Sequence, residues 1–399
     1  MQEPEETVTN SATPILDSGV LPPRARRTTW RGLSIGFVLG LLWALIVIKV
    51  VGGQFENLFP GLGVLLLVFA IFLAITVHEI GHLTAGWVVG FRFSVIRIGP
   101  FSLNLEHGRL RVRIRREMPA LGYAGMHIDN VRRLHRRMLI YIAAGPIANL
   151  LSVPATVLLV NYAFPRLGKS WVAVPAAEFA LISLMFTMLS LVPIQSGLLS
   201  DGARIEMLLC SRERSRRWLS IAAIGMSSNG GKRAKDWRRT NLQRATSVHD
   251  NSMDTFTGIW LAYLSANDRK DADTAAGHLE RCLDFTPRLP ISLRELVAQE
   301  AAVFSAWFRN DGSLADKWLT QVKKPLLMQR LVRLRLDVAL RCAHQDYPAA
   351  TLAWQEGLTF IERATSGASQ HRLRESWLEW QEEIRERQSL TPNALSRAD

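Results

Sequence analysis

The chain has 399 residues, of which 48% are hydrophobic, and a formal net charge of +13. This length is too great for one compact core and predicts two or three units. The three cysteines are scattered, with no CxxC motif or Cys/His cluster, which excludes a disulfide framework and a thiolate zinc site. The positive charge suits an anionic membrane surface or nucleic acid.

Four apolar runs indicate an integral membrane protein. We expect residues 1–32 to form a disordered basic tail, because they are polar and end in arginines. The apolar run 33–51 is too long for a signal peptide and lacks a cleavage site, so it is interpreted as a retained span. Further spans are predicted over 61–89, 138–164 and 172–199.

Arginine residues set the expected orientation. They concentrate in the loop 91–137 and again after the last apolar run, while 52–60 has none and 165–171 has few basic residues. The positive-inside rule therefore predicts a multi-pass protein of a bacterial cytoplasmic membrane, with both termini cytoplasmic. The basic stretch 211–254, with its interspersed tryptophans, is interpreted as a juxtamembrane linker that contacts anionic lipid. A nucleic-acid partner is not expected.

Period-two alternation follows the second apolar run. Apolar and polar residues alternate over 91–95, 101–106 and 110–115, with turns at Gly99-Pro100 and His107-Gly108. This pattern predicts a small antiparallel β-hairpin or meander. Its edge could receive an extended peptide by strand addition, or the hairpin could only cap the helices.

The last part of the chain, 255–399, has apolar residues at helical spacing and a weak internal sequence repeat. Polar turns at Asn267-Asp268, Asn310-Asp311 and Gln345-Asp346 each separate two helical stretches. This predicts a cytoplasmic all-α domain that resembles a degenerate tetratricopeptide-like array, with a surface for a cytoplasmic protein partner. A plain helical bundle is the alternative.

The second apolar run contains the sequence His78-Glu79-Ile80-Gly81-His82. Two histidines at i and i+4 project from the same face of a helix, and this HExxH arrangement binds Zn²⁺ with the glutamate as general base. Ionisable side chains inside an apolar helix are costly and therefore indicate function. We predict that His78 and His82 bind one zinc ion and that Glu79 is catalytic.

Catalytic zinc needs a third protein ligand, and the residues after His82 offer none. Asp201 follows the fourth apolar run on the predicted cytoplasmic side, at the depth of His82, and is the favoured ligand. Four other residues remain as alternatives: His107, His127, Asp129 and Glu178.

These motifs together resemble the site-2 protease family of intramembrane zinc metalloproteases. The resemblance rests on HExxH, on Gly145-Pro146-Ile-Ala-Asn149 in a later span, and on Leu191-Val-Pro193 followed by Asp201-Gly202. It covers roughly residues 61–205. It departs from the family pattern in the long interval before Asp201 and in Ser190, which stands near where an asparagine is common.

The resemblance implies a fold and an activity. The fold would be a polytopic α-helical membrane protein, with a four-span metalloprotease core over 33–210. The implied activity is zinc-dependent cleavage of a transmembrane segment in a membrane-tethered protein. His78, His82 and Asp201 would bind the zinc ion, and Asn149 would help to hold substrate or an oxyanion. A CAAX-type protease using Glu178 and a non-catalytic membrane scaffold are the alternatives.

Overall fold

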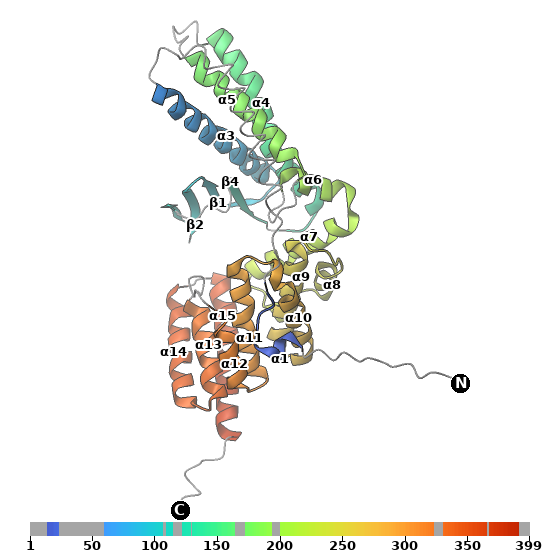
Figure 1. Ribbon diagram of the computed structural model, residues 1–399, viewed down its shortest axis with the longest axis vertical. Helices are drawn as coiled ribbons and strands as arrows, with labels where there is room; N and C mark the ends of the chain where they lie inside the picture. Colours follow the sequence, from blue (N-terminus) through green and yellow to red (C-terminus); the bar gives the residue numbers. More distant parts are fainter. Residues whose placement is uncertain are drawn as a thin grey trace, which may run out of the picture. The chain divides into compact units, whose positions relative to one another are not determined.

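The described part of the protein is mostly helical and contains one small antiparallel sheet (Figure 1). A computed structural model describes residues 14–23, 60–106, 109–114, 122–128, 130–163, 172–193, 200–322, 330–364 and 367–390. The described residues form two compact units. The helix–sheet unit comprises residues 60–226, and the helical unit comprises residues 14–23 together with 227–390.

Three long helices build most of the helix–sheet unit. These are α3 (Pro60–Val88), α4 (Leu134–Leu158) and α5 (Ala173–Leu191), and all three pack against one another (Figure 1). Helix α4 continues as a π-helical turn, η1 (Leu159–Ala163). The helices expected over 61–89, 138–164 and 172–199 are therefore present with shifted ends. The expected span 33–51 lies outside the described residues.

Within the described part of the chain, two helices are long and apolar enough to cross a membrane. They are Leu65–Val88 and Leu134–Ala163, and the apolar helix Pro175–Leu191 is shorter. Length and composition alone are weak support for membrane insertion, because buried helices of soluble proteins can have both.

A four-stranded antiparallel sheet follows α3. It contains β1 (Arg92–Ile98), β2 (Phe101–Glu106), β3 (Arg109–Ile114) and β4 (Gly122–His127), in the order β3-β2-β1-β4. The predicted hairpin and meander are confirmed as β1 to β3. Strand β4 was not expected, since its glycine-rich sequence lacks clear alternation. It forms the sheet edge beside β1 and contacts α3.

The segment expected as a linker, 211–254, is largely helical. It contains most of α7 (Arg212–Asn229), the 3₁₀ turn η4 (Ala234–Asp236) and α8 (Arg239–Ala245). The linker interpretation must be corrected, because α7 packs apolar residues against the helix–sheet core and the chain beyond residue 226 belongs to the helical unit.

Three helical hairpins and a final helix form the helical unit. The hairpins pair α9 (Met253–Asp268) with α10 (Ala272–Phe285), α11 (Ile291–Phe308) with α12 (Gly312–Leu319), and α13 (Arg330–Ala343) with α14 (Tyr347–Ala364); α15 (Gly367–Leu390) follows. The predicted succession of helix, turn and helix is confirmed. Whether it belongs to the tetratricopeptide class stays a prediction.

The three hairpin turns share one backbone design. Each has a residue with positive φ, at Lys270, Asn310 and Gln345, followed directly by an aspartate. Asp271, Asp311 and Asp346 each accept a hydrogen bond from the backbone amide three residues later, which caps the second helix. The expected alignment of Asp268 with Asp311 is therefore wrong. Asp268 instead pairs with Arg233.

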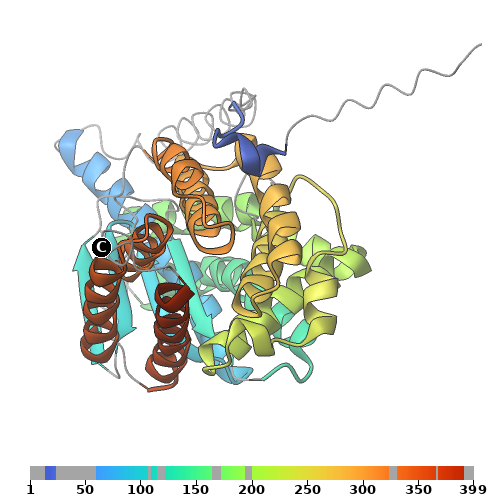
Figure 2. The same ribbon diagram turned by 90° about the horizontal axis from the view of Figure 1, so that it is seen from below.

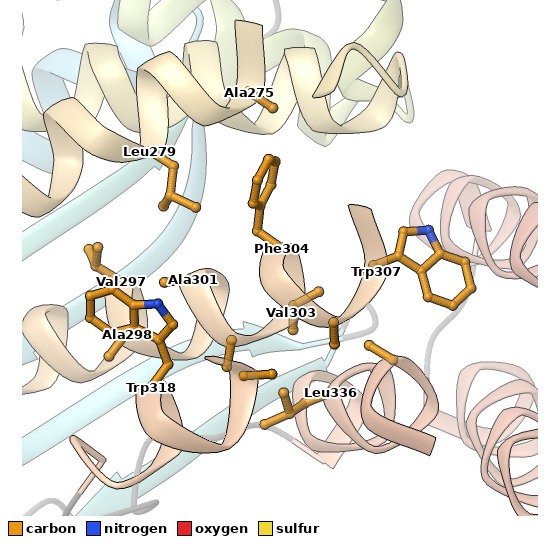
Figure 3. Close-up of a cluster of buried hydrophobic side chains, with 14 of the residues drawn as sticks. Ala275, Leu279, Val297, Ala298, Ala301, Val303, Phe304, Trp307, Trp318 and Leu336 are labelled. Atoms are coloured by element: carbon orange, nitrogen blue, oxygen red, sulfur yellow. The ribbon is translucent and has the colours of Figure 1, made fainter. Parts of the chain in front are cut away.

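Helix α11 lies at the centre of the helical unit. Its residues Val297, Ala298 and Ala301 are fully buried. Figure 3 shows side chains of α10 on one side of α11, and Trp318 of α12 with Leu336 of α13 on the other. A helix at such a position buries most of its surface, and its buried charges are paired, as Glu300 is with Arg335.

Residues 14–23 belong to the helical unit rather than to a disordered tail. They contain a short helix, α1 (Ile15–Ser18), which contacts α10 (Figures 1 and 2). Leu16 is only 1% exposed within the core of this unit. The expectation of disorder over 1–32 is corrected for these residues, because Leu16 completes a hydrophobic core that lies far away in the sequence.

Candidate metal centre

His78 and His82 project from one face of α3 into the interior of the helix–sheet unit. Both are buried, at 8% and 7% exposure, although they lie in an apolar helix. Their Nε2 atoms are 3.2 Å apart, and the two rings meet edge to face. One face of a single helix therefore presents two imidazole nitrogens at the same point, as the i, i+4 spacing predicts.

Asp201 joins this pair from another helix, α6 (Asp201–Cys210), as its first residue. Its Oδ2 lies 3.0 Å from Nε2 of His78 and 3.5 Å from Nε2 of His82. Burial disfavours the charged carboxylate, but the hydrogen bonds to both histidines outweigh this and hold the pKa of Asp201 well below its usual range. The carboxylate is therefore ionised at neutral pH, as a metal ligand must be.

The start of α6 is fixed by two local features. The hydroxyl of Ser200 accepts a hydrogen bond from the amide of Ala203 and donates one to the carbonyl of Val192. Gly202 lies so close to the end of α5 that a Cβ atom there would come within 1.9 Å of the Leu191 carbonyl oxygen. These contacts place Asp201 at the level of the histidines.

The other ring nitrogen of His82 determines its tautomer. Its Nδ1 lies 2.8 Å from the carbonyl oxygen of Tyr141, which can only accept a hydrogen bond. Nδ1 therefore carries a proton, and Nε2 is the nitrogen that faces His78 and Asp201 and is available to a metal ion. A backbone carbonyl behind a histidine is a common support for a metal ligand.

Asn149 of α4 plays the corresponding part behind His78. Its side-chain amide nitrogen lies 3.4 Å from Nδ1 of His78, and the residue is fully buried. Its Oδ1 has no hydrogen-bond partner among the described residues. A half-turn of the amide group would let Oδ1 accept the Nδ1 proton and leave Nε2 free to bind a metal.

Glycine residues let α4 approach the metal-binding face of α3. A Cβ atom at Gly145 would lie 2.4 Å from Nε2 of His82 and 2.8 Å from Nε2 of His78. On α3, a Cβ atom at Gly81 would lie 2.5 Å from the carbonyl oxygen of Ala144. The space in front of the two Nε2 atoms therefore exists because residue 145 has no side chain.

Glu79 lies beside the cluster and faces strand β4. It is 6% exposed, and its carboxylate interacts with the backbone amide of Ala124. A Cβ atom at Gly122 would lie 2.2 Å from Oε1 of Glu79. The carbonyl of Ala124 accepts a 2.5 Å hydrogen bond from the hydroxyl of Tyr141, so β4, α3 and α4 together hold Glu79 in place.

The structure brings together the favoured residues and not the alternatives. Among the described residues, His78, His82 and Asp201 are the group able to hold a metal ion, with ligand atoms within 4.8 Å of one another. His127 and Glu178 are not part of this group, while His107 and Asp129 lie outside the described residues. The roles of Glu79 and Asn149 remain predictions, as does the identity of the metal.

Sequence reasoning missed the residues that support the cluster. Tyr141 acts through its backbone carbonyl, which no side-chain pattern reveals, and strand β4 lacked a clear alternation. Gly145 was visible in a motif, but its contact with both histidines needs the packing of α4 on α3. Searches of protein-family models, curated proteins and solved structures find no match to this chain.

Proposed function

We propose that this protein is an intramembrane zinc metalloendopeptidase that cleaves a transmembrane segment of a membrane-tethered protein. The observation that carries the proposal is the buried cluster of His78, His82 and Asp201, with Glu79 beside it. Two neutral imidazoles and one carboxylate leave a coordination position open, which is the ligand pattern of catalytic rather than structural zinc sites.

The donor set fits zinc in type. The Nε2 atoms of His78 and His82 and the ionised carboxylate of Asp201 lie within 4.8 Å of one another, and a zinc ion would replace the protons that Nε2 shares with Asp201. Bound zinc would lower the pKa of a water molecule toward 7 and polarise a peptide carbonyl. No ligand atom would have to move far, since all three already meet.

Glu79 is placed to act as the general base. It follows His78 directly in the chain. Its carboxylate contacts β4 and is not one of the metal ligands. A base in this position can take a proton from water and deliver it to the leaving amine. In this proposal Asn149 is a positioning residue for His78, which revises its expected contact with substrate.

The strand edge near Glu79 offers a place for an extended substrate. Among the described strands, β4 pairs with β1 alone, so its other side is an edge of the sheet, and it contacts α3. At this edge the amide of Ala124 contacts Glu79 and its carbonyl accepts a hydrogen bond from Tyr141. We assign strand addition to β4, where a substrate unwound from its helix would take over these backbone groups beside the general base.

The polarity of the three-helix bundle supports membrane insertion. In the two long apolar helices only 39% and 28% of the most apolar window is buried, so most of it is on the surface. Large exposed apolar residues include Leu65, Val68 and Phe69 of α3, Ile147, Leu150 and Leu151 of α4, and Met188 of α5. Polar residues lie inside, which is the arrangement expected in lipid.

The sheet has the same amphipathic character. Phe101 and Leu105 of β2 and Leu110, Val112 and Ile114 of β3 form an apolar face, paired across the two strands and exposed. The other face carries arginines at alternate positions of β3. An apolar face beside α3 and a basic face opposite suit a sheet at the boundary between lipid tails and anionic headgroups.

The position of residues 14–23 supports an even number of spans. These residues pack inside the helical unit, so the chain before the first apolar run and the chain after residue 227 share one side of any membrane. If α3 and α4 both cross, then the run 33–51 and α5 must both cross or both remain outside. Their apolar composition favours four spans, with both termini cytoplasmic.

Metal content tests the proposal without knowledge of the substrate. We expect about one zinc ion per chain in detergent-purified protein, and loss of zinc in His82→Ala and in Asp201→Ala, because each removes a ligand. Glu178→Gln is the matched control, since it removes a buried carboxylate outside the cluster. Full zinc retention by Asp201→Ala would exclude the assigned third ligand.

Activity is tested with Glu79→Gln. This variant should keep its zinc, because Glu79 is not a ligand, and should lose cleavage. Comparison of membrane proteins from cells with wild-type chain and with Glu79→Gln should show fragments that only the wild type produces. A zinc-containing wild type whose fragments match those of Glu79→Gln would instead favour the alternative of a non-catalytic scaffold.

A further inference from the structure

Residues 14–23 lie against a surface of the helical unit formed by α10, α11 and α12, which we call the docking surface. Leu16 enters the hydrophobic core, and its carbonyl oxygen accepts a 3.1 Å hydrogen bond from Nε1 of Trp318, which is fully buried. Ile15 and Leu21 pack against the same core from its rim. A fully buried leucine flanked by two partly buried apolar residues is the anchor pattern of a bound peptide.

The polar contacts of this segment are those by which proteins recognise a peptide turn. Glu280 of α10 accepts hydrogen bonds from two successive backbone amides, those of Ile15 at 2.5 Å and Leu16 at 2.8 Å. Arg309, at the end of α11, forms an ion pair with Asp17. Arg294 of α11 donates a 2.7 Å hydrogen bond to the carbonyl oxygen of Pro22.

The segment itself is a compact single turn. The hydroxyl of Ser18 donates to the carbonyl oxygen of Ile15 and accepts from the amide of Val20. Gly19 ends the turn with φ +68°, and a Cβ atom there would lie 2.9 Å from Cβ of Lys317. Its contacts are therefore with α10, α11 and α12 and within itself, as in a ligand.

We infer that this docking surface is a peptide-binding site, occupied in cis by residues 14–23. A partner protein that carries an apolar pair followed by an acidic residue competes for it. The chemistry of the partner follows from the contacts. The partner would place an apolar side chain in the core, as Leu16 does, a second one at the rim, as Ile15 does, and a carboxylate against Arg309. The hydrogen bonds with Glu280 and Trp318 involve only backbone atoms and would not select a side chain.

While residues 14–23 occupy the site, a partner can bind only by displacing them. A segment of the same chain competes with a separate partner as an intramolecular ligand, so a partner must bind strongly or be abundant to replace it. Residues 24–32 separate this segment from the first apolar run. Exchange would therefore free the chain that leads into the membrane part of the protein, whether or not the protein is a protease.

The test converts the cis segment into a separate peptide. A protease recognition sequence is inserted between Arg27 and Thr28 in the full chain, and the purified protein is cut in detergent. We expect the released N-terminal fragment to stay bound. An excess of a synthetic peptide of residues 12–24 should displace it, and a peptide with Leu16→Glu should bind roughly a hundredfold more weakly, because a charge replaces a buried apolar group.

Two further peptides examine the partner chemistry. A peptide that keeps Ile15-Leu16-Asp17 within scrambled flanks should still displace the fragment. A peptide with Asp17→Arg should fail on the wild type and regain binding on the charge-reversed variant Arg309→Asp. Binding of the Asp17→Arg peptide equal to that of the native one would overturn the assigned recognition.

The fold of the helical unit is followed in the same samples by circular dichroism. Displacement without loss of helical signal supports a ligand-like segment. Unfolding on displacement, or immediate loss of the cut fragment without any competitor, would overturn the inference. Unfolding would mean that residues 14–23 are an integral part of the core. Loss of the fragment would mean that the docking surface has no affinity for the separate segment. Neither outcome depends on metal content or cleavage, so the proposed function is tested separately.

Discussion

At the scale of single residues, the candidate metal centre depends on an absent side chain. Two histidines and an aspartate can meet only if nothing fills the space in front of their ligand atoms, and Gly145 of α4 borders that space. A methyl group there would lie within van der Waals overlap of both Nε2 atoms. The glycine is therefore as necessary to the site as the ligands are.

Gly145→Ala should lower zinc affinity by at least roughly tenfold, as changes in residues that support metal ligands typically do. The added methyl must push α4 from α3 or turn the imidazoles. Zinc per chain and competition with a chelator measure the effect. Gly225→Ala is the matched control, because its Cβ atom would have no neighbour within 4 Å and should leave zinc affinity unchanged. Equal affinity in both variants would contradict the assigned packing.

Some residues of the site could be predicted from the sequence and others could not. His78, Glu79 and His82 could be predicted because local helical geometry alone places them together. Asp201 could be inferred from depth and sidedness in the expected topology. The contacts of Tyr141 and Gly145 could not, because they arise from the packing of α4 on α3, which sequence spacing does not encode.

At the scale of elements, the helical hairpins repeat one turn. A residue with positive φ precedes a capping aspartate in each of the three hairpins. Helical periodicity predicted the hairpins. The turn of the first hairpin was misplaced, because Asn267-Asp268 has the same residue types as Asn310-Asp311 and was aligned with it. Asp268 serves another purpose, since it forms an ion pair with Arg233 of the segment before α8. Similar residues therefore indicated the wrong register.

Gln345→Gly should stabilise the helical unit by up to about 1 kcal/mol, because a side chain at φ +62° is strained by roughly 1–2 kcal/mol while glycine has greater freedom in the unfolded chain. Asp346→Ala should destabilise the same turn by about 1 kcal/mol through loss of the cap. Thermal unfolding followed by tryptophan fluorescence measures both. Shifts of the same sign would contradict the turn design.

At the scale of the whole molecule, a buried arginine joins distant parts of the helical unit. Arg233 is 3% exposed and pairs with Asp268 of α9 and Glu379 of α15. Composition could predict a charged surface but not this internal bridge, because its members lie far apart in the sequence. The same limit hid the docking of Leu16, because its segment is short and its packing partners lie far away in the sequence.

Stability of the helical unit should fall as the pH drops from about 4.5 toward 2. Hydrogen bonds from Arg233 and, to a smaller extent, Lys235 lower the pKa of Glu379 to about 2 against the effect of its burial. A depressed pKa in the folded state means that the contribution is complete above the ordinary value and is lost as the carboxylate becomes protonated. Glu379→Gln should be less stable at neutral pH, with a smaller loss over this range. Urea unfolding at each pH measures it, and parallel pH profiles would contradict the assignment.

The topology of the whole chain can be tested through the docking of residues 14–23. Because these residues belong to the same unit as the chain after residue 227, an engineered cysteine at Thr7 and one at Ser396 should lie on the same side of the membrane. A membrane-impermeant maleimide added to intact cells should label neither until the membrane is permeabilised. The native cysteines are replaced by serine so that only the engineered positions react.

A cysteine at Lys169, between the third and fourth apolar runs, is the matched positive control. It should react in intact cells, because four spans place that loop on the outer side. Labelling of Thr7→Cys but not of Ser396→Cys would require an odd number of crossings. That result would be incompatible with a helical unit that contains residues 14–23 together with residues 227–390, and therefore with the way in which Leu16 completes its core.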